Sequence, residues 1–115
     1  LLHRVEDEMQ CDSLPFASKD AGILDLIRVM TVSGLGLCVI DDKERGVVTD
    51  GDIRRAIETY GEALFSMRAE EIMSTQPITV EVGTRMEDAL SLMDSRKITS
   101  LLVTDDTSIV GVVKK

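Results

Sequence analysis

An internal repeat constrains the fold of this 115-residue chain more than any other feature of its sequence. Residues 23–30 match residues 86–93 in apolar pattern at an offset of 63, and the match continues through the apolar runs that follow both segments. Gly46-Val47-Val48 matches Gly111-Val112-Val113 at an offset of 65, so a two-residue insertion in a turn accounts for the difference. A match over several successive elements indicates two copies of one module, neither large enough to bury a sufficient core alone.

Each copy is predicted to contain an amphipathic helix, over 23–30 and over 86–93, because apolar residues recur there at helical spacing. Thr84 and Glu87 have the spacing of a capping box at the start of the second helix. Copy one ends in a further helix over 53–60, which a glycine is placed to terminate. The sequence stops before an equivalent helix of copy two.

Short apolar runs bounded by polar turns predict two strands after the first helix of each copy. A further extended segment precedes that helix, marked in both copies by a proline that excludes helix locally. The expected strands and turns are 14–17, 37–40, 46–49 and the turn 41–44 in copy one, and 76–80, 101–104, 109–113 and the turn 105–108 in copy two. These elements predict an α+β fold built from two β-α-β-β modules that share a core.

Composition disfavours several classes of function. A net charge of −8 argues against binding to nucleic acid, and the single tyrosine and two phenylalanines are too few for a base-stacking surface. No apolar run approaches the roughly 20 residues of a membrane span, and the opening residues do not resemble a signal peptide. Cys11 and Cys38 form no zinc-binding pattern, which favours free thiols in a reduced, cytoplasmic protein over a disulfide.

The segment most informative about function is 46–55, where a buried strand is followed within three residues by a helix. Such a junction directs free amide groups and the positive end of the helix dipole at one point, which favours an anion. Thr49 supplies a hydroxyl there, Asp50 and Asp52 supply carboxylates able to accept ribose hydroxyls, and Arg55 can face phosphate. Spacing alone favours a simpler interpretation, in which Thr49 or Asp50 caps the helix and Asp52 complements its dipole.

A second candidate segment is 96–100, where the helix of copy two leads into its strand. A basic helix C-terminus is expected on electrostatic grounds, and Thr99 and Ser100 can satisfy nearby backbone groups, so the segment in isolation is structural. A role for this segment in ligand binding is favoured only if it lies against the 49–52 junction of the other copy. His3 is the only histidine and no nucleophile pairs with it, so we expect neither a catalytic nor a metal site in this chain.

A repeated β-α-β-β module whose first copy ends in GVVTDGD before a helix closely resembles a pair of cystathionine-β-synthase (CBS) domains, over essentially the whole chain. Residues 1–9, 49–55 and 97–101 are similar, more narrowly, to the C-terminal regulatory half of bacterial arabinose 5-phosphate isomerases. The resemblance implies tandem β-α-β-β-α CBS modules forming one pseudo-two-fold pair. Repeat 1 would span 9–61 and repeat 2 would span 72–115 without its last helix, after a linker over 1–8 from an absent sugar-isomerase domain.

By this resemblance, Thr49 and Asp52 match the ribose-contacting Thr and Asp of the family, and the opposing wall of the site comes from the other copy. The implied ligand-binding residues are Thr49, Asp50, Asp52, Arg55, Ile78, Thr79, Lys97, Ile98, Thr99 and Ser100. The sequence departs from the family pattern at Leu102, where many relatives have proline. It departs again at Lys114-Lys115, where copy two lacks the Thr-x-x-Asp ribose clamp, so one ligand per chain is expected.

The resemblance implies a regulatory module that binds a small-molecule nucleotide or nucleotide sugar, either an adenine nucleotide or CMP-Kdo, with no required cofactor and no catalysis by this chain. The full-length parent would be an aldose-ketose isomerase that makes arabinose 5-phosphate for Kdo, in lipopolysaccharide or capsule biosynthesis. The alternative is a structural oligomerisation module that binds no ligand.

Self-association is also implied, because CBS pairs commonly associate through their helices. A homodimer is expected through the pair and a higher homo-oligomer with the isomerase domain, whereas nucleic acid and membranes are not expected partners. The candidate residues for the dimer surface are Ile53, Ala56, Ile57, Tyr60, Met86, Leu90 and Met93.

Overall fold

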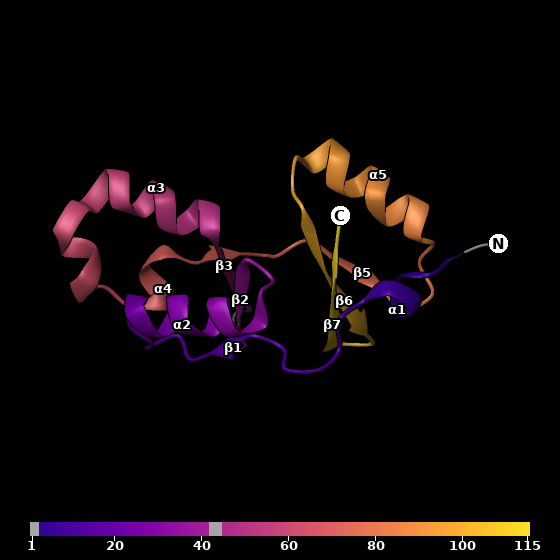
Figure 1. The fold of residues 1–115 in the computed structure, drawn as a ribbon, viewed down its shortest axis with the longest axis horizontal. Coiled ribbons are helices and arrows are strands. Elements are labelled where there is room, and N and C mark those ends of the chain that lie inside the picture. Colours follow the sequence, from indigo (N-terminus) through magenta and orange to yellow (C-terminus); the bar gives the residue numbers. More distant parts are fainter. Residues whose placement is uncertain (1–2, 42–44) are drawn as a thin grey trace. The chain divides into compact units, whose positions relative to one another are not determined.

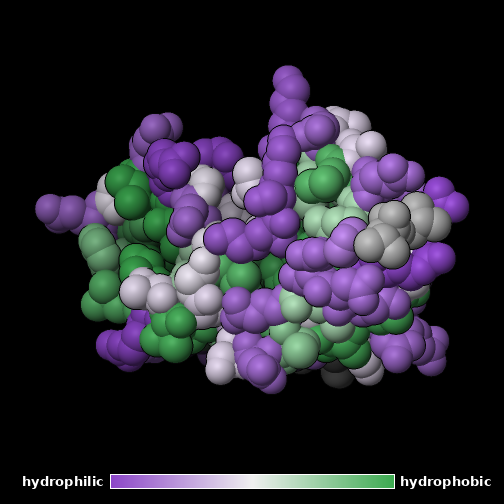
Figure 2. All heavy atoms as spheres, turned by 45° about the vertical axis from the view of Figure 1, so that its right-hand side comes forward, coloured by the Kyte–Doolittle hydropathy of each residue, from purple (hydrophilic) through white to green (hydrophobic). Residues whose placement is uncertain are grey.

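The computed structural model of the chain describes residues 3–41 and 45–115. They form two units, one comprising Pro15–Pro77 and the other combining the N-terminal segment up to Leu14 with Ile78–Lys115 (Figure 1). Each unit holds one copy of the repeat and is described by itself. On the face drawn in Figure 2, apolar side chains reach the surface between hydrophilic ones.

The unit of copy one is a four-stranded sheet with helices packed against it. Its strands β1 (Phe16–Ala17), β2 (Leu37–Ile40), β3 (Gly46–Thr49) and β4 (Ser74–Thr75) are hydrogen-bonded in that order. The pair β1–β2 is parallel, and β2–β3 and β3–β4 are antiparallel. The helices are α2 (Ile23–Ser33), α3 (Asp50–Tyr60), the 3-10 helix η1 (Gly61–Ser66) and α4 (Ala69–Ile72). Their inner faces bury Ile23, Leu26, Met30, Ile53, Ala56, Leu64 and Ala69 against Cys38, Ile40 and Val48 of the sheet.

The unit of copy two repeats this plan with three strands. Parallel β5 (Thr79–Glu81) and antiparallel β7 (Ser108–Lys114) flank β6 (Ser100–Asp105), and the helices are α5 (Met86–Arg96) and α1 (Val5–Glu8). Its core consists of Val5, Ala89, Met93, Leu101, Val103 and Val113. The register of β6 with β7 shifts between Val103 and Thr104, whose partners are Gly111 and Ile109, so that Val110 is left without a partner in the pairing.

The predicted α+β fold with two β-α-β-β modules is confirmed, and β2 and β3 lie where the sequence places them. The capping box at Thr84 and Glu87 is wrong. Arg85 is the N-cap of α5, so Glu87 is only the second helical residue, and the Thr84 hydroxyl instead donates to the Glu81 carbonyl at 2.7 Å. The predicted turn over 41–44 lies outside the described residues except for its first residue.

The candidate dimer surface is wrong for three of its residues. Ile53 and Ala56 are buried in the core of the copy-one unit, and Met93 is buried in the core of the copy-two unit. Periodicity identified the apolar face of each helix, and these side chains are the part of that face that packs on its own sheet. Ile57 and Tyr60 remain exposed.

The short helices α1 and α4 are exchanged between the units. The segment that precedes copy one packs in the unit of copy two, where Gln10 and Val112 exchange backbone hydrogen bonds of 2.8 and 2.9 Å. The segment that precedes copy two packs in the unit of copy one, where β4 pairs with β3. The expected linker over residues 1–8 therefore includes a helix, α1, whose Val5 is fully buried.

Similar sequences underlie the two exchanged segments. Arg4 and Arg68 each begin a helix, and their amides donate to the side chains of Asp7 and Glu71 at 2.9 and 3.0 Å. A methionine follows each helix and lies on a glycine of the neighbouring strand. A Cβ on Gly111 would lie 2.8 Å from Cγ of Met9, and one on Gly46 would lie 3.0 Å from Cγ of Met73. The same Cβ atoms would lie 3.0 Å from the carbonyl oxygen of Gln10 and 3.2 Å from that of Ser74, so the close backbone approach favours glycine at both positions.

The two cysteines are expected to differ sharply in reactivity. Cys11 is exposed, whereas Cys38 is buried in β2, and burial raises the pKa of its thiol from 9.0 to about 11. Because the thiolate is the nucleophile, a thiol reagent at pH 8 should modify Cys11 in the folded protein and leave Cys38 unmodified. Mass spectrometry of the labelled chain tests this, with urea-unfolded protein as the control in which both residues react. Equal labelling rates in the folded protein would contradict the burial of Cys38.

Candidate ligand-binding site

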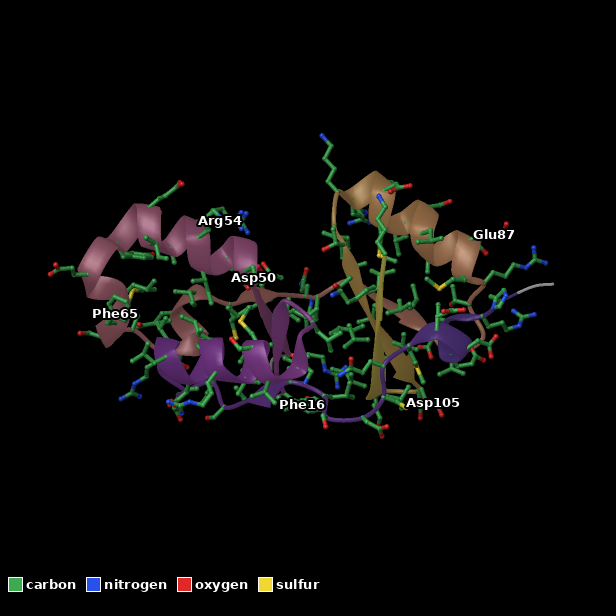
Figure 3. The ribbon with its side chains drawn as sticks, viewed as in Figure 1. Phe16, Asp50, Arg54, Phe65, Glu87 and Asp105 are labelled. Atoms are coloured by element: carbon green, nitrogen blue, oxygen red, sulfur yellow. The ribbon has the colours of Figure 1, made fainter. Side chains whose placement is uncertain are left out.

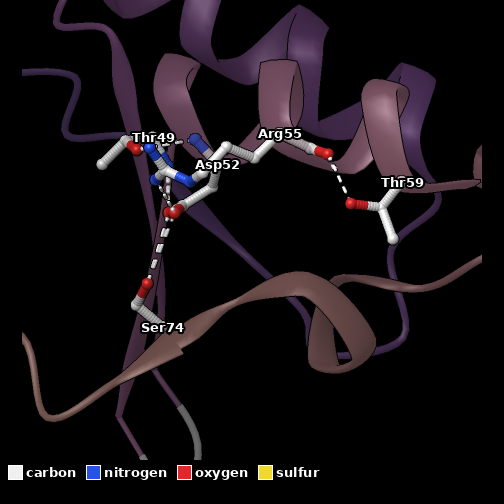
Figure 4. A network of polar contacts seen from close by, with 5 residues as sticks. All are labelled: Thr49, Asp52, Arg55, Thr59 and Ser74. Atoms are coloured by element: carbon white, nitrogen blue, oxygen red, sulfur yellow. Dashed lines mark hydrogen bonds and ion pairs between the residues drawn. The ribbon is translucent and has the colours of Figure 1, made fainter.

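The junction between β3 and α3 forms a complete capping box. Thr49 is the N-cap of α3, and its hydroxyl accepts from the amide of Asp52 at 3.1 Å (Figure 4). The Asp52 carboxylate accepts from the amide of Thr49 at 2.9 Å through Oδ2. The simpler interpretation offered by the sequence, helix capping, is therefore correct for this pair. It is not a complete account of Asp52, because the carboxylate has further contacts.

The second oxygen of Asp52 is held by side chains rather than by the backbone. Arg55 Nη2 donates to Oδ1 at 2.7 Å, and the Ser74 hydroxyl lies 3.4 Å from Oδ1 and 3.5 Å from Oδ2 (Figure 4). The Asp52 side chain is only 11% exposed, whereas that of Arg55 is 70% exposed. Because most of the Arg55 side chain is in water, its guanidinium stays hydrated when it leaves Oδ1.

Sequence reasoning missed Ser74 as a neighbour of Asp52. Ser74 belongs to the two-residue strand β4 and is opposite Val47 of β3, which places its hydroxyl beside the start of α3. A strand of two residues has no periodicity, so no signal in the sequence could place it there.

Asp50 and Gly36 lie together beside the same junction. Asp50 is the first residue of α3 and is exposed, and its amide donates to the carbonyl of Gly36 at 3.1 Å (Figure 3). Gly36 has a φ of +70°, and a Cβ there would lie 3.0 Å from Oδ2 of Asp50. Gly36 therefore allows the backbone to lie close to the Asp50 carboxylate. In the sequence, only the glycines of Gly34-Leu35-Gly36 indicate such a close approach.

The remaining candidate residues belong to the unit of copy two. Lys97 ends α5 in the left-handed conformation with a φ of +57°, and the amide of Ile98 donates to Met93 at 3.0 Å. The carbonyl of Thr99 accepts from the amide of Lys115 at 2.9 Å, and Ser100 opens β6 opposite Lys114. Local structure thus explains the backbone of this segment, while the side chains of Lys97 and Thr99 are exposed.

The other two candidates, Ile78 and Thr79, lie at the start of β5. Thr79 is exposed and pairs with Leu102 of β6, and Ile78 packs against the core of its unit. The structure therefore groups Thr49, Asp50, Asp52 and Arg55 in one unit and Ile78, Thr79 and Lys97–Ser100 in the other. Their joining in one site stays a prediction.

The described residues contain no group of three or more His, Cys, Asp or Glu side chains arranged to hold a metal ion. Among these same residues, no helix is both long enough and apolar enough to span a bilayer.

Comparison with known proteins gives one family for both halves of the chain. The profile of the CBS domain matches residues 5–59 and again residues 69–115. The chain is 38% identical over 117 aligned positions to the arabinose 5-phosphate isomerase KdsD of Salmonella typhimurium, covering 98% of this chain and 35% of that protein. It thus spans about a third of the length of the curated relatives it matches.

Solved structures with the same fold include the CBS domain pair of protein MJ0100 in complex with 5′-methylthioadenosine and S-adenosyl-L-methionine. That structure has a TM-score of 0.86 at 21% identity and matches 99% of this chain and 90% of its own. A hexameric CBS-CP12 protein from bloom-forming cyanobacteria has a TM-score of 0.87 at 19% identity, over 99% of this chain and 65% of its own.

Proposed function

This chain belongs to the CBS-domain family, and from that premise we propose that it is a regulatory module that binds a ribonucleotide or a nucleotide sugar. The observation that carries the proposal is the environment of Asp52. One of its oxygens is fixed by the capping box, and the other is held by the exposed Arg55 and by Ser74. A capping residue needs only the first of these contacts.

The chemistry of a ribose fits this arrangement. A ribose hydroxyl can donate to Oδ1 when Arg55 withdraws, since a carboxylate oxygen has two lone pairs and the capping bond occupies Oδ2. Arg55, once released, carries a positive charge that suits the phosphate or carboxylate of the same ligand. The wall formed by Ile78, Thr79 and Lys97–Ser100 would complete the site, with one ligand per chain, because Lys114 stands in copy two where Thr49 stands in copy one.

Two ligands are candidates under this proposal. An adenine nucleotide is supported by the adenosine derivatives bound to the MJ0100 pair. CMP-Kdo is supported by the similarity to arabinose 5-phosphate isomerases, because an end product of that pathway would act by feedback. In this proposal the parent protein is a cytoplasmic arabinose 5-phosphate isomerase of Kdo, lipopolysaccharide or capsule biosynthesis, and the present chain is its regulatory part.

The rival proposal is an oligomerisation module without a ligand. Both proposals include self-association as a homodimer, and a higher homo-oligomer when the isomerase domain is attached. The hexameric CBS-CP12 protein shows that proteins with this fold assemble. The two proposals differ in whether a nucleotide stabilises the chain.

A thermal-shift screen decides between them. AMP, ADP, ATP, CMP-Kdo, S-adenosyl-L-methionine and 5′-methylthioadenosine are each added to the purified chain, with ribose 5-phosphate as a control for the sugar phosphate alone. A ligand at 100 times its Kd stabilises the folded state by about 2.7 kcal/mol, which raises Tm by several degrees for a chain of this size. No shift with any nucleotide at millimolar concentration would favour the ligand-free module.

A further inference from the structure

The proposed function provides an acceptor for only one of the two neighbouring hydroxyls of a ribose. Withdrawal of Arg55 opens one place on Oδ1 of Asp52, the place that its Nη2 now occupies at 2.7 Å. The other carboxylate oxygen, Oδ2, accepts from the amide of Thr49 at 2.9 Å and has the Ser74 hydroxyl at 3.5 Å. Since a carboxylate oxygen has two lone pairs, Oδ2 already has a donor for each. The second ribose hydroxyl therefore needs an acceptor beside the carboxylate.

Ser74 is placed to be that acceptor. Its hydroxyl lies between the two oxygens of Asp52, 3.4 Å from Oδ1 and 3.5 Å from Oδ2 (Figure 4). A serine hydroxyl is one donor and also an acceptor, so Ser74 can donate to Oδ2 while its own oxygen accepts from a ligand. The residue is exposed, which leaves its oxygen within reach of a ligand at Asp52.

The second copy of the repeat shows that the fold does not require a serine at this position. Gln10 is opposite Val112 of β7, as Ser74 is opposite Val47 of β3. Both residues follow a methionine that lies on a glycine of the neighbouring strand. The same backbone pairing therefore accepts a glutamine, and packing alone does not explain the serine.

The serine occurs in the copy that carries the carboxylate. In copy two, where Lys114 stands in place of Thr49, the side chain of Gln10 donates to the carbonyl of Asp12 at 3.1 Å, a contact within its own segment. In copy one, the equivalent side chain is directed at Asp52 instead. This difference associates the serine with the ligand-binding junction rather than with the scaffold.

We propose that Ser74 accepts a hydrogen bond from the second ribose hydroxyl, which makes the site selective for ribonucleotides over their deoxy forms. The inference rests on the proposed function and adds a specificity-determining residue to the same site. In the bound state, one ribose hydroxyl donates to Oδ1 of Asp52, the other donates to Ser74, and Ser74 donates to Oδ2. Each of the three hydroxyl hydrogens then has its own acceptor, and a deoxy ligand lacks one of these bonds.

Isothermal titration calorimetry tests the selectivity with 5′-AMP and 5′-CMP, each compared with its 2′-deoxy and 3′-deoxy forms. The unaltered chain should bind the ribonucleotide more tightly than either deoxy form. In Ser74→Ala, one of these two affinity ratios should fall by about 2- to 12-fold, the effect of one neutral hydrogen bond. The ratio that falls identifies the hydroxyl, 2′ or 3′, that donates to Ser74.

Two further variants separate a contact with the ligand from a change in β4. Ser74→Thr keeps the hydroxyl and should retain the ratio. Thr75→Ala is the matched control, because it removes the neighbouring exposed hydroxyl, which strand alternation places on the opposite face. It should change neither ratio.

The outcomes distinguish this inference from the proposed function. If Ser74 only holds Asp52 in place, Ser74→Ala weakens ribo and deoxy ligands alike, both ratios stay unchanged, and the inference is overturned while the proposed function stands. If the unaltered chain binds neither AMP nor CMP at millimolar concentration, the inference is also overturned. The thermal-shift screen then decides separately whether the proposed function survives.

Discussion

Replacing Asp52 with alanine is expected to weaken ribonucleotide binding by about 10- to 150-fold. A hydrogen bond to a charged group contributes about 1.5–3 kcal/mol, and this change removes the carboxylate that would accept the ribose hydroxyl. Isothermal titration calorimetry with the ligand found by the thermal-shift screen measures the effect. Binding that is unchanged in Asp52→Ala would refute the ribose-clamp assignment.

The capping box changes what this variant does to stability. An acid in the first helical turn that only complements the helix dipole would contribute about 0.3–1 kcal/mol to the free energy of unfolding. Because Asp52 also accepts from the Thr49 amide, its loss should reduce the free energy of unfolding by about 0.5–2 kcal/mol. Binding is therefore measured at a temperature where chemical denaturation shows the variant to be folded. Glu58→Ala is the matched control, because it removes an exposed acid of the same helix and should alter neither binding nor stability.

Replacing Val5 with aspartate should unfold the unit of copy two. Val5 lies in α1 and is fully buried with Ala89, Met93 and Leu101. An unpaired charge at this position should reduce the free energy of unfolding by at least about 3 kcal/mol, because the core offers the carboxylate neither a partner nor water. Hydrogen exchange should show the amides of β6 losing protection, whereas the amides of β2, in the other unit, keep more of theirs.

The matched control is Val82→Asp, the same substitution at an exposed valine of the same unit. It should change the free energy of unfolding by about 0.5 kcal/mol or less. If Val5→Asp were as harmless as this control, residues 1–8 would be only the linker that the sequence predicted, and α1 would be dispensable for copy two.

The sequence by itself determined the features that depend on nearby residues. Short apolar runs between glycine and polar turns gave β2 and β3 their bounds, because only a strand of four residues fits such a run. Helical spacing placed α2, α3 and α5, and Gly61 ends α3 as predicted. The Thr49–Asp52 pair was also identifiable, since a capping box needs only two residues three positions apart.

Tertiary structure alone decided which distant segments meet. The sequence predicted only a linker over residues 1–8, yet α1 packs in the unit of copy two and α4 packs in the unit of copy one. A four-residue helix has little stability of its own and follows the surface that buries Val5 or Ala69. In the same way, apolar character did not separate Met93, which is buried, from Val32, which is exposed. Ser74 reached Asp52 through a two-residue strand. Burial and these contacts depend on which distant segments pair with each other, and the local sequence does not determine that pairing.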